Sequence, residues 1–317
     1  MIRGRHIAAL AVCSIASGLW LGATRARPQA ASQGPIIAGN PAPSAEQIHS
    51  LLVRVVESQH RDDRALDEFE RTEHVVAHKP GNTDIISDIS ERHVPSPAGD
   101  IKLKLTENGT PVSPELYRQE LEFAANALGQ ASHPDDRYKE GVAKYDKRHH
   151  DHAELIDEAA KAFRITWAGR ETLPASTPGQ GPRTLTKFLL DPDPDYKPIN
   201  RLATTFQHIH AAVWVDEAQA QIAHVEGDIA TDITFVGGVV AKVYHGGYIV
   251  MDQDEVAPGI WLPTLYKYEV DGRKFVFAFS AHERTDITGF RRVGTPQQSL
   301  EMIRNELNNL TAAAPSR

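Results

Sequence analysis

The sequence predicts an α+β fold in which helices pack against an antiparallel β-sheet. Between residues 201 and 292, apolar and aromatic segments of strand length follow one another with turn signals between them, a pattern typical of successive hairpins. Segments before and after this region carry apolar residues at helical spacing. The only cysteine among the 317 residues is Cys13, so the fold must depend on an apolar core and not on disulfides.

The composition argues against several classes of protein. Apolar residues make up 41% and charged residues 24%, the balance of a soluble globular protein, which excludes a disordered chain, a collagen and a polytopic membrane protein. Asp and Glu number 42 against 34 Lys and Arg. The resulting net charge of −8 argues against a nucleic-acid partner.

The N-terminal segment has the order of a secretory signal peptide. Arg3 and Arg5 precede an apolar run over residues 7–23, and small residues follow it. The run has 17 residues, which is short for a transmembrane helix, so an uncleaved anchor is the weaker alternative. We expect a signal peptide at 1–26, whose cleavage removes Cys13, and a periplasmic or secreted protein with no transmembrane segment in its mature chain.

A flexible leader and a capped helix follow. Residues 27–43 are rich in Pro, Ala, Gly and Gln and indicate the leader. The helix begins at Ser44, because Ser44 and Gln47, three residues apart, fit a capping box. Its buried face is predicted from apolar residues at helical spacing: Ile48, Leu51, Leu52 and Val55. This helix opens the main domain, which we place at 44–292.

The segment 66–107 predicts strands, and the clearest are 69–78 and 101–105. In the second of these, apolar residues alternate with two lysines, the pattern of a half-buried strand. The dipeptide Asn108–Gly109 predicts the turn that ends it.

Residues 113–163 predict a helical insert. Ser113 is its expected cap and Pro114 takes the first helical position. The buried face of this first helix is expected to comprise Tyr117, Leu121, Ala124 and Leu128. A polar stretch follows at 132–152. A second helix is expected from about Asp151, with one apolar side: Leu155, Ala159 and Phe163.

The region from 201 to 292 predicts six to eight strands. The clearest are 205–215, 219–229, 239–244, 248–253, 261–270 and 273–282. Glycine pairs at 237–238 and 246–247 interrupt the pattern and indicate bulges or tight turns. Thr295–Pro296 begins the last helix, so we expect a C-terminal helix and tail at 293–317.

The dipeptide Asp271–Gly272 predicts a hairpin with a two-residue type I′ turn. That turn would place Tyr268 opposite Phe275 and Glu269 opposite Lys274. Five rings would then share one face of the sheet: Tyr266, Tyr268, Phe275, Phe277 and Phe279. Such a face must lie against helices or against a ligand. We take these five residues, with Trp261 near the rim, as candidate ligand-binding residues; plain core packing is the alternative.

No motif fixes a catalytic site. Histidines cluster at His149, His150 and His152, while His208 and His210 lie two apart on a predicted strand. If the two clusters met, they could form a tetrahedral zinc site for a metal-dependent hydrolase. The sequence has no His-Glu-x-x-His motif, and solvated histidines are the simpler interpretation. We therefore assign no catalytic residue, no metal ligand and no cofactor.

Four segments carry a family resemblance. They are Ala-Val-Trp-Val-Asp-Glu at 212–217, Ile-Ala-His-Val-Glu at 222–226, Pro-Gly-Ile-Trp-Leu-Pro at 258–263 and Leu-Thr-Glu-Asn-Gly-Thr-Pro-Val-Ser at 105–113. With the order of the predicted elements, they resemble the periplasmic lipoprotein-carrier superfamily, which includes the Lol carrier and the outer-membrane lipoprotein receptor. The resemblance is closest to uncharacterised secreted bacterial members of that superfamily.

The resemblance implies an incomplete, open antiparallel β-barrel, or strongly curved sheet, with helices over its concave face. It also implies a non-enzymatic binding protein that holds a lipid, a lipoprotein acyl chain or another apolar ligand inside that sheet. Two alternatives stay open: the metal-dependent hydrolase, and an envelope interaction protein without a small ligand, whose contact surface would be the polar insert. The identity of any protein partner is left open by the sequence.

Overall fold

The computed structural model describes residues 42–174, 181–235, 241–275 and 277–313. The expected signal peptide at 1–26 and nearly all of the expected leader therefore lie outside the described residues, as do Gly237 and Gly238.

The helices of the described chain are α2, α3, α4 and α5, at Ala45–Leu66, Pro114–Gly129, Asp136–Ala162 and Pro296–Ala313. Two 3₁₀ turns, η1 and η2, occupy Gln130–Ser132 and Ala203–His208. The strands β1 to β8 are Phe69–His78, Ile85–Val94, Ile101–Glu107, Thr110–Pro111, Phe163–Leu173, Arg183–Pro192, Ile209–Asp216 and Gln221–Ile229. The strands β9 to β13 are Ile233–Phe235, Ala241–Val243, Tyr248–Ala257, Ile260–Lys274 and Phe277–Arg292.

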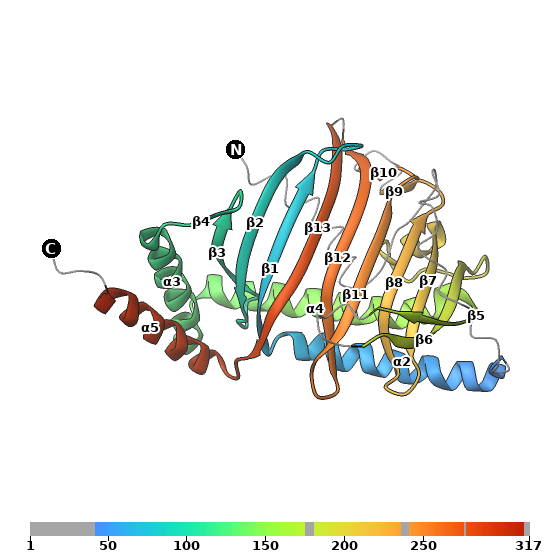
Figure 1. The fold of residues 1–317 in the computed structure, drawn as a ribbon, viewed down its shortest axis with the longest axis horizontal. Helices are drawn as coiled ribbons and strands as arrows, with labels where there is room; N and C mark the ends of the chain where they lie inside the picture. Colours follow the sequence, from blue (N-terminus) through green and yellow to red (C-terminus); the bar gives the residue numbers. More distant parts are fainter. Residues whose placement is uncertain (1–41, 175–180, 236–240, 276, 314–317) are drawn as a thin grey trace. The chain divides into compact units, whose positions relative to one another are not determined.

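Within the described residues these strands form one 13-stranded antiparallel sheet (Figure 1). The order along it is β4-β3-β2-β1-β13-β12-β11-β8-β7-β6-β5, with β10 pairing to β12 and β9 pairing to β10. The path has two free ends, so the sheet is open and does not close into a barrel. The predicted α+β class with a curved, open antiparallel sheet is confirmed.

The described chain divides into two compact units. The first comprises the chain up to Asp62 together with 78–83 and 152–284. The second comprises 63–77, 84–151 and the chain from Thr285 onward. Each unit has its own apolar core, as follows.

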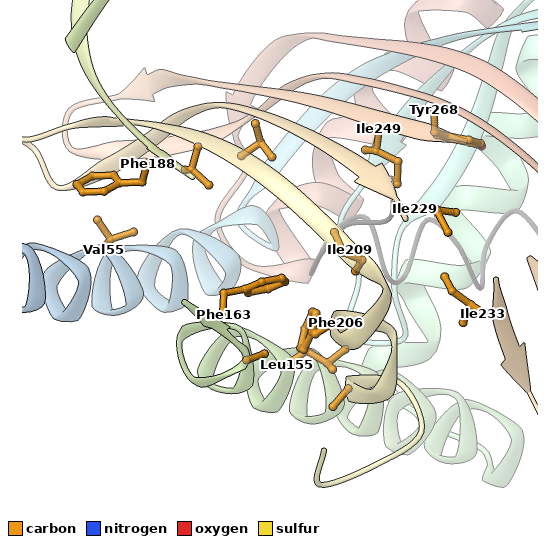
Figure 2. Packing of buried hydrophobic residues seen from close by; sticks show 14 of the residues in the cluster. Val55, Leu155, Phe163, Phe188, Phe206, Ile209, Ile229, Ile233, Ile249 and Tyr268 are labelled. Atoms are coloured by element: carbon orange, nitrogen blue, oxygen red, sulfur yellow. The ribbon is translucent and has the colours of Figure 1, made fainter. Parts of the chain in front are cut away.

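In the first unit, α2 lies against strands β6, β7 and β8 (Figure 1). Of the stripe predicted on this helix, Leu51 and Val55 are buried in a core that includes Phe188 and Ile249, and Ile48 packs against it. Leu52, predicted with them, is only half-buried and does not belong to this core. Figure 2 shows Phe163 and Phe206 meeting in the same core, with their ring centroids 5.6 Å apart. Amphipathic spacing on the helix and alternation on the strands thus produce one continuous apolar layer.

In the second unit, α3 and α5 pack on strands β2 and β3. Ser113 caps α3 by accepting a hydrogen bond from the Leu116 backbone N–H, and Pro114 occupies the first turn, as predicted. The core formed by these elements comprises Val94, Ile101, Leu103, Leu121, Ala124, Leu128, Leu300 and Ile303. The apolar face predicted for α3 is therefore the face that is buried, with Tyr117 packed at its edge.

The helix α4 corrects the prediction for the polar stretch at 132–152. The structure is helical from Asp136, and Phe163, predicted on the helix, is the first residue of β5. Ion pairs four residues apart support the exposed turns: Lys144 with Glu140 at 2.7 Å and Lys147 with Asp151 at 2.6 Å. Apolar periodicity misses a helix of this kind because its first turns carry charge on nearly every face.

The predicted turn at Asp271–Gly272 is wrong. Strand β12 continues through both residues to Lys274, and the chain turns at Phe275, whose φ is +54°. The Tyr268 hydroxyl accordingly donates a hydrogen bond to Glu283 at 2.5 Å, so Tyr268 does not lie opposite Phe275.

A close approach of strand β10 explains why glycine occurs at position 272. Val243 lies opposite Gly272 in the β10–β12 register. A Cβ atom on Gly272 would lie 2.4 Å from the Lys242 carbonyl oxygen and 2.6 Å from the Phe279 ring. This glycine therefore permits close packing inside a strand and does not supply a turn.

Replacing Gly272 with alanine is expected to lower the free energy of unfolding by about 2 kcal/mol, because the added methyl group overpacks a site bounded by backbone. Thermal unfolding followed by circular dichroism measures the change. The control is Gly129→Ala at the end of α3, where a Cβ meets nothing within 4 Å. Equal melting temperatures for Gly272→Ala and the wild type would contradict the account.

Candidate functional site

The N-terminal half of α2 is fixed by the predicted capping box. The Ser44 backbone N–H donates to Gln47 Oε1 at 2.8 Å, and the Gln47 backbone N–H donates to Ser44 Oγ at 3.2 Å. These reciprocal bonds satisfy two donors at the helix start. Ile48 and Leu51, in the turns that follow, pack against or within the core of the sheet.

A hollow of about 630 Å³ lies beside this half of the helix, within the first unit. We call it the α2 groove. Its lining residues are Ala42, Pro43, Glu46, Gln47, Ile48, Ser50, Leu51, Arg54, Arg170, Phe188 and Glu217. Residues of α2 form one side, and β5, β6 and the chain after β7 form the other.

The floor of the α2 groove is apolar. Phe188, from β6, is only 1% exposed and packs with Leu51 in the core, as Figure 2 shows for Phe188 beside Val55. Ile48 packs on the same core and is half-buried. A chain of methylene groups placed on this floor would contact Ile48 and remove its own apolar surface from water.

The side of the groove formed by the sheet carries an ion pair. Glu217 Oε1 accepts hydrogen bonds from Arg170 Nε at 3.1 Å and Nη2 at 2.7 Å, and also from the Thr186 hydroxyl. Burial alone would raise the pKa of Glu217, but the bonds from Thr186 and Arg170 hold this pKa below its ordinary value. Glu217 is therefore ionised at neutral pH, and its charge is compensated within the groove wall.

Arg54, on the helix side, differs from Arg170. It is exposed, and it forms no hydrogen bond or ion pair with any residue in the described part of the chain. Its charge acts at longer range, because it helps to lower the pKa of Glu217. The groove thus has an apolar floor, a satisfied ion pair and one guanidinium available to a ligand.

None of the six predicted ligand-binding residues lines the α2 groove. Trp261 is buried in a separate cluster with Leu185 and Trp214, and its indole N–H donates to Gln219 at 2.9 Å. Tyr268 is buried in the main core of the first unit.

The five rings that were predicted to share one face differ widely in burial. Phe275 is 52% exposed at the turn and Phe277 is 74% exposed, while Tyr266 and Phe279 are half-buried. Tyr268 and Phe279 still lie together, in or against the main core of the first unit, whereas the chain turns at Phe275 and Phe277 is the first residue of β13.

The groove residues that the sequence prediction missed are Arg54, Arg170, Phe188 and Glu217. Arg54 lies three residues after Leu51, on the side of the predicted stripe, and this was the one available signal. The other three come from strands or turns far along the chain. Their approach to α2 depends on strand order, which no local pattern reveals.

A second polar cluster in the first unit surrounds Trp214. The Trp214 indole lies between Lys187, whose Nζ is 4.4 Å from the ring centroid, and His224, whose ring centroid is 4.8 Å away. His224 Nδ1 lies 2.5 Å from Asp252 and its Nε2 lies 3.3 Å from Glu226. Burial alone would lower the pKa of His224, but the bonds to these two carboxylates raise it to about 9.

This raised pKa predicts a pH dependence of stability. The ordinary pKa of histidine is about 6.5, so His224 stabilises the fold fully below about pH 6.5 and loses this contribution as pH rises through about 9. Urea denaturation from pH 6 to 10 measures it. We expect the wild-type midpoint to fall at the alkaline end and His224→Gln to lack that step. Parallel profiles for the two proteins would contradict the assignment.

The two histidine clusters have separate partners. His208 is the last residue of η2, so it does not share a strand with His210, contrary to the prediction. His210 Nδ1 lies 2.6 Å from Asp191, whereas His149 contacts Asp67 at 3.5 Å. Among the described residues, no group of three or more His, Cys, Asp or Glu side chains could hold a metal ion.

The second unit contains a buried ionic network formed by residues of β1 and β2 and by Asp100, which directly precedes β3. Arg71 donates to Asp100 at 2.5 Å and to Glu73 at 2.9 Å, and His93 lies 3.3 Å from Asp100. Burial would raise the pKa of Asp100, but bonds to His93 and Arg71 hold this pKa well below its usual range. The network joins three strands, and we assign it a structural role.

No protein-family model matches the chain, and no curated protein sequence matches it. A comparison with solved structures found a "putative outer membrane lipoprotein-sorting protein domain from Vibrio parahaemolyticus", with 10% identity and a TM-score of 0.30, covering 81% of this chain and 99% of that chain. At that level of similarity we take nothing about ligand or activity from it. Within the described residues, no helix is long and apolar enough to cross a membrane.

Proposed function

We propose that the protein is an exported, non-enzymatic binding protein that holds a lipid acyl chain or a similar apolar ligand in the α2 groove. The observation that carries this proposal is the hollow of about 630 Å³ with Ile48, Leu51 and Phe188 at its floor. Pockets that bind small molecules have volumes of about 300–1,000 Å³ and are lined mainly by apolar side chains with a few polar groups. The α2 groove has that size, and its apolar floor is bordered by a larger polar share than is usual: six of its eleven lining residues are polar or charged.

Export is the part of the proposal that rests on sequence. The charged, apolar and small-residue order of residues 1–26 supports a cleaved signal peptide. A periplasmic or secreted protein meets acyl chains as parts of lipids and lipoproteins, and these are the ligands that we propose. The aromatic residues Phe275 and Phe277 are the second position at which such a chain could bind, because their rings are exposed.

Native mass spectrometry tests the proposal. The protein is purified under mild conditions and measured before and after incubation with palmitate. We expect a mass increase of one palmitate per chain, because the groove is a single hollow of limited volume. A clean mass of the chain alone, with no increase after palmitate is added, would overturn the proposed function.

A further inference from the structure

We infer that the ligand of the α2 groove is a single-chain amphiphile with an anionic head, a carboxylate or a phosphate, and that Arg54 binds this head. The inference rests on the proposed function and names the class of ligand. It follows from the position of Arg54, from the charges around it and from the apolar floor beside it.

The position of Arg54 directs its guanidinium into the groove. Ser50 and Arg54 are four residues apart on α2 and therefore lie on one face of the helix, and Leu51 is three residues from Arg54. Long side chains on a helix point back toward its N-terminus and cover the preceding turn. The Arg54 side chain consequently lies over the turn of Ser50 and Leu51, both of which line the groove.

Among the described residues, Arg54 is the groove cation that no hydrogen bond or ion pair occupies, although it lies near enough to Glu217 to help lower the pKa of that carboxylate. Arg170 is occupied by Glu217, which accepts two of its N–H groups. The remaining acid in the lining is Glu46, in the first turn of α2. Glu46 precedes Arg54 by eight residues, which is about 12 Å along a helix axis, beyond the reach of an ion pair. An anionic head at Arg54 would therefore meet a free guanidinium at one end of the groove.

The chemistry of that end matches carboxylates and phosphates. A guanidinium presents its donors in a planar fork that binds either group through two parallel hydrogen bonds. An apolar chain attached to such a head would extend over Ile48, Leu51 and Phe188. A neutral head would leave Arg54 without a partner and gain only the apolar contacts.

The test uses three ligands with the same palmitoyl chain: palmitate, palmitoyl lysophosphatidate and the neutral monopalmitoylglycerol. Their dissociation constants are measured below their critical micelle concentrations by displacement of a fluorescent fatty acid. We expect each anionic ligand to bind at least tenfold more tightly than the neutral one. The order of the two anionic ligands then identifies the preferred head as carboxylate or phosphate, and either order supports the inference.

Two variants of α2 make the test specific. Arg54→Gln is expected to lower the affinity for both anionic ligands to that for the neutral ligand, which itself stays unchanged. The control is Arg64→Gln, which removes the same charge from an exposed position of α2 outside the groove. Retention of the anion preference in Arg54→Gln would overturn the inference, as would equal binding of all three ligands by the wild type. If none of the three ligands binds the wild type, the proposed function itself fails.

Discussion

Replacing Asp100 with asparagine is expected to lower the free energy of unfolding by about 3–5 kcal/mol. The substitution keeps the shape of the side chain but removes the charge that faces Arg71 at 2.5 Å and His93 at 3.3 Å. Asp100 is only 20% exposed, so water replaces little of the lost interaction. Removal of one partner from a buried ion pair costs about this much because the other charge is left uncompensated.

The effect of Asp100→Asn depends on pH in a defined direction. The pKa of Asp100 is held below its ordinary value, about 3.9 in the unfolded chain, so its carboxylate stabilises the fold above about pH 4. This contribution is lost as pH falls further. The difference between the variant and the wild type should therefore be full at pH 7 and shrink in acid.

Urea denaturation followed by far-ultraviolet circular dichroism measures this effect. The control is Asp136→Asn at the start of α4, where the side chain is fully exposed and pairs with the exposed Lys139. We expect its unfolding midpoint to stay at the wild-type value. A wild-type midpoint for Asp100→Asn at pH 7 would show that the network contributes nothing to the fold.

Filling the α2 groove should abolish ligand binding. Ser50 lines the groove and is exposed, so tryptophan at this position would place its indole in the hollow without displacing core residues. We expect Ser50→Trp to weaken the binding of palmitate by at least about 100-fold, which is a loss of about 2.8 kcal/mol of binding free energy. Displacement of a fluorescent fatty acid measures it.

The matched control for this variant is Val53→Trp. Val53 is on the same helix and is 45% exposed, but it does not line the groove. The same residue type is thus added to the same helix outside the site. Unchanged binding in Val53→Trp, together with loss in Ser50→Trp, is the expected outcome. Equal affinities for the two variants would remove the groove as the binding site.

The features that the sequence predicts well are local ones. The caps at Ser44 and Ser113 occur as predicted because they depend on residues three positions apart. Strand β1 has the predicted bounds, and the turn at Asn108–Gly109 occurs with positive φ at both residues. In each case the signal and the structure lie in the same few residues.

The failure at Asp271–Gly272 shows where local signals mislead. An Asp-Gly pair between apolar segments favours a type I′ turn when only its neighbours are considered. Here the lack of a Cβ at Gly272 allows strand β10 to pack closely, because the Lys242 carbonyl oxygen lies 2.4 Å from the position that a Cβ would take. Strand pairing 30 residues away thus outweighs the turn preference, and the register of every ring after Gly272 changes with it.

The candidate site is not predictable in the same way. Its apolar floor joins α2 to Phe188 of β6, and its ion pair joins Arg170 of β5 to Glu217. These residues are separated by more than a hundred positions from α2. Only the helix side, with Leu51 and Arg54 on one face, carries a periodic signal. The sequence shows which residues are aromatic, but the burial of each ring depends on strand pairing, which the sequence alone does not show.

Photo-crosslinking tests the central claim most directly. A palmitate analogue with a diazirine at the end of its chain is bound, irradiated and located by mass spectrometry of the digested protein. We predict adducts within residues 42–54 and on the peptide that contains Phe188, and their loss in Ser50→Trp. Adducts confined to the aromatic residues at 266–279, or no light-dependent adducts at all, would contradict the assignment of the α2 groove as the ligand site.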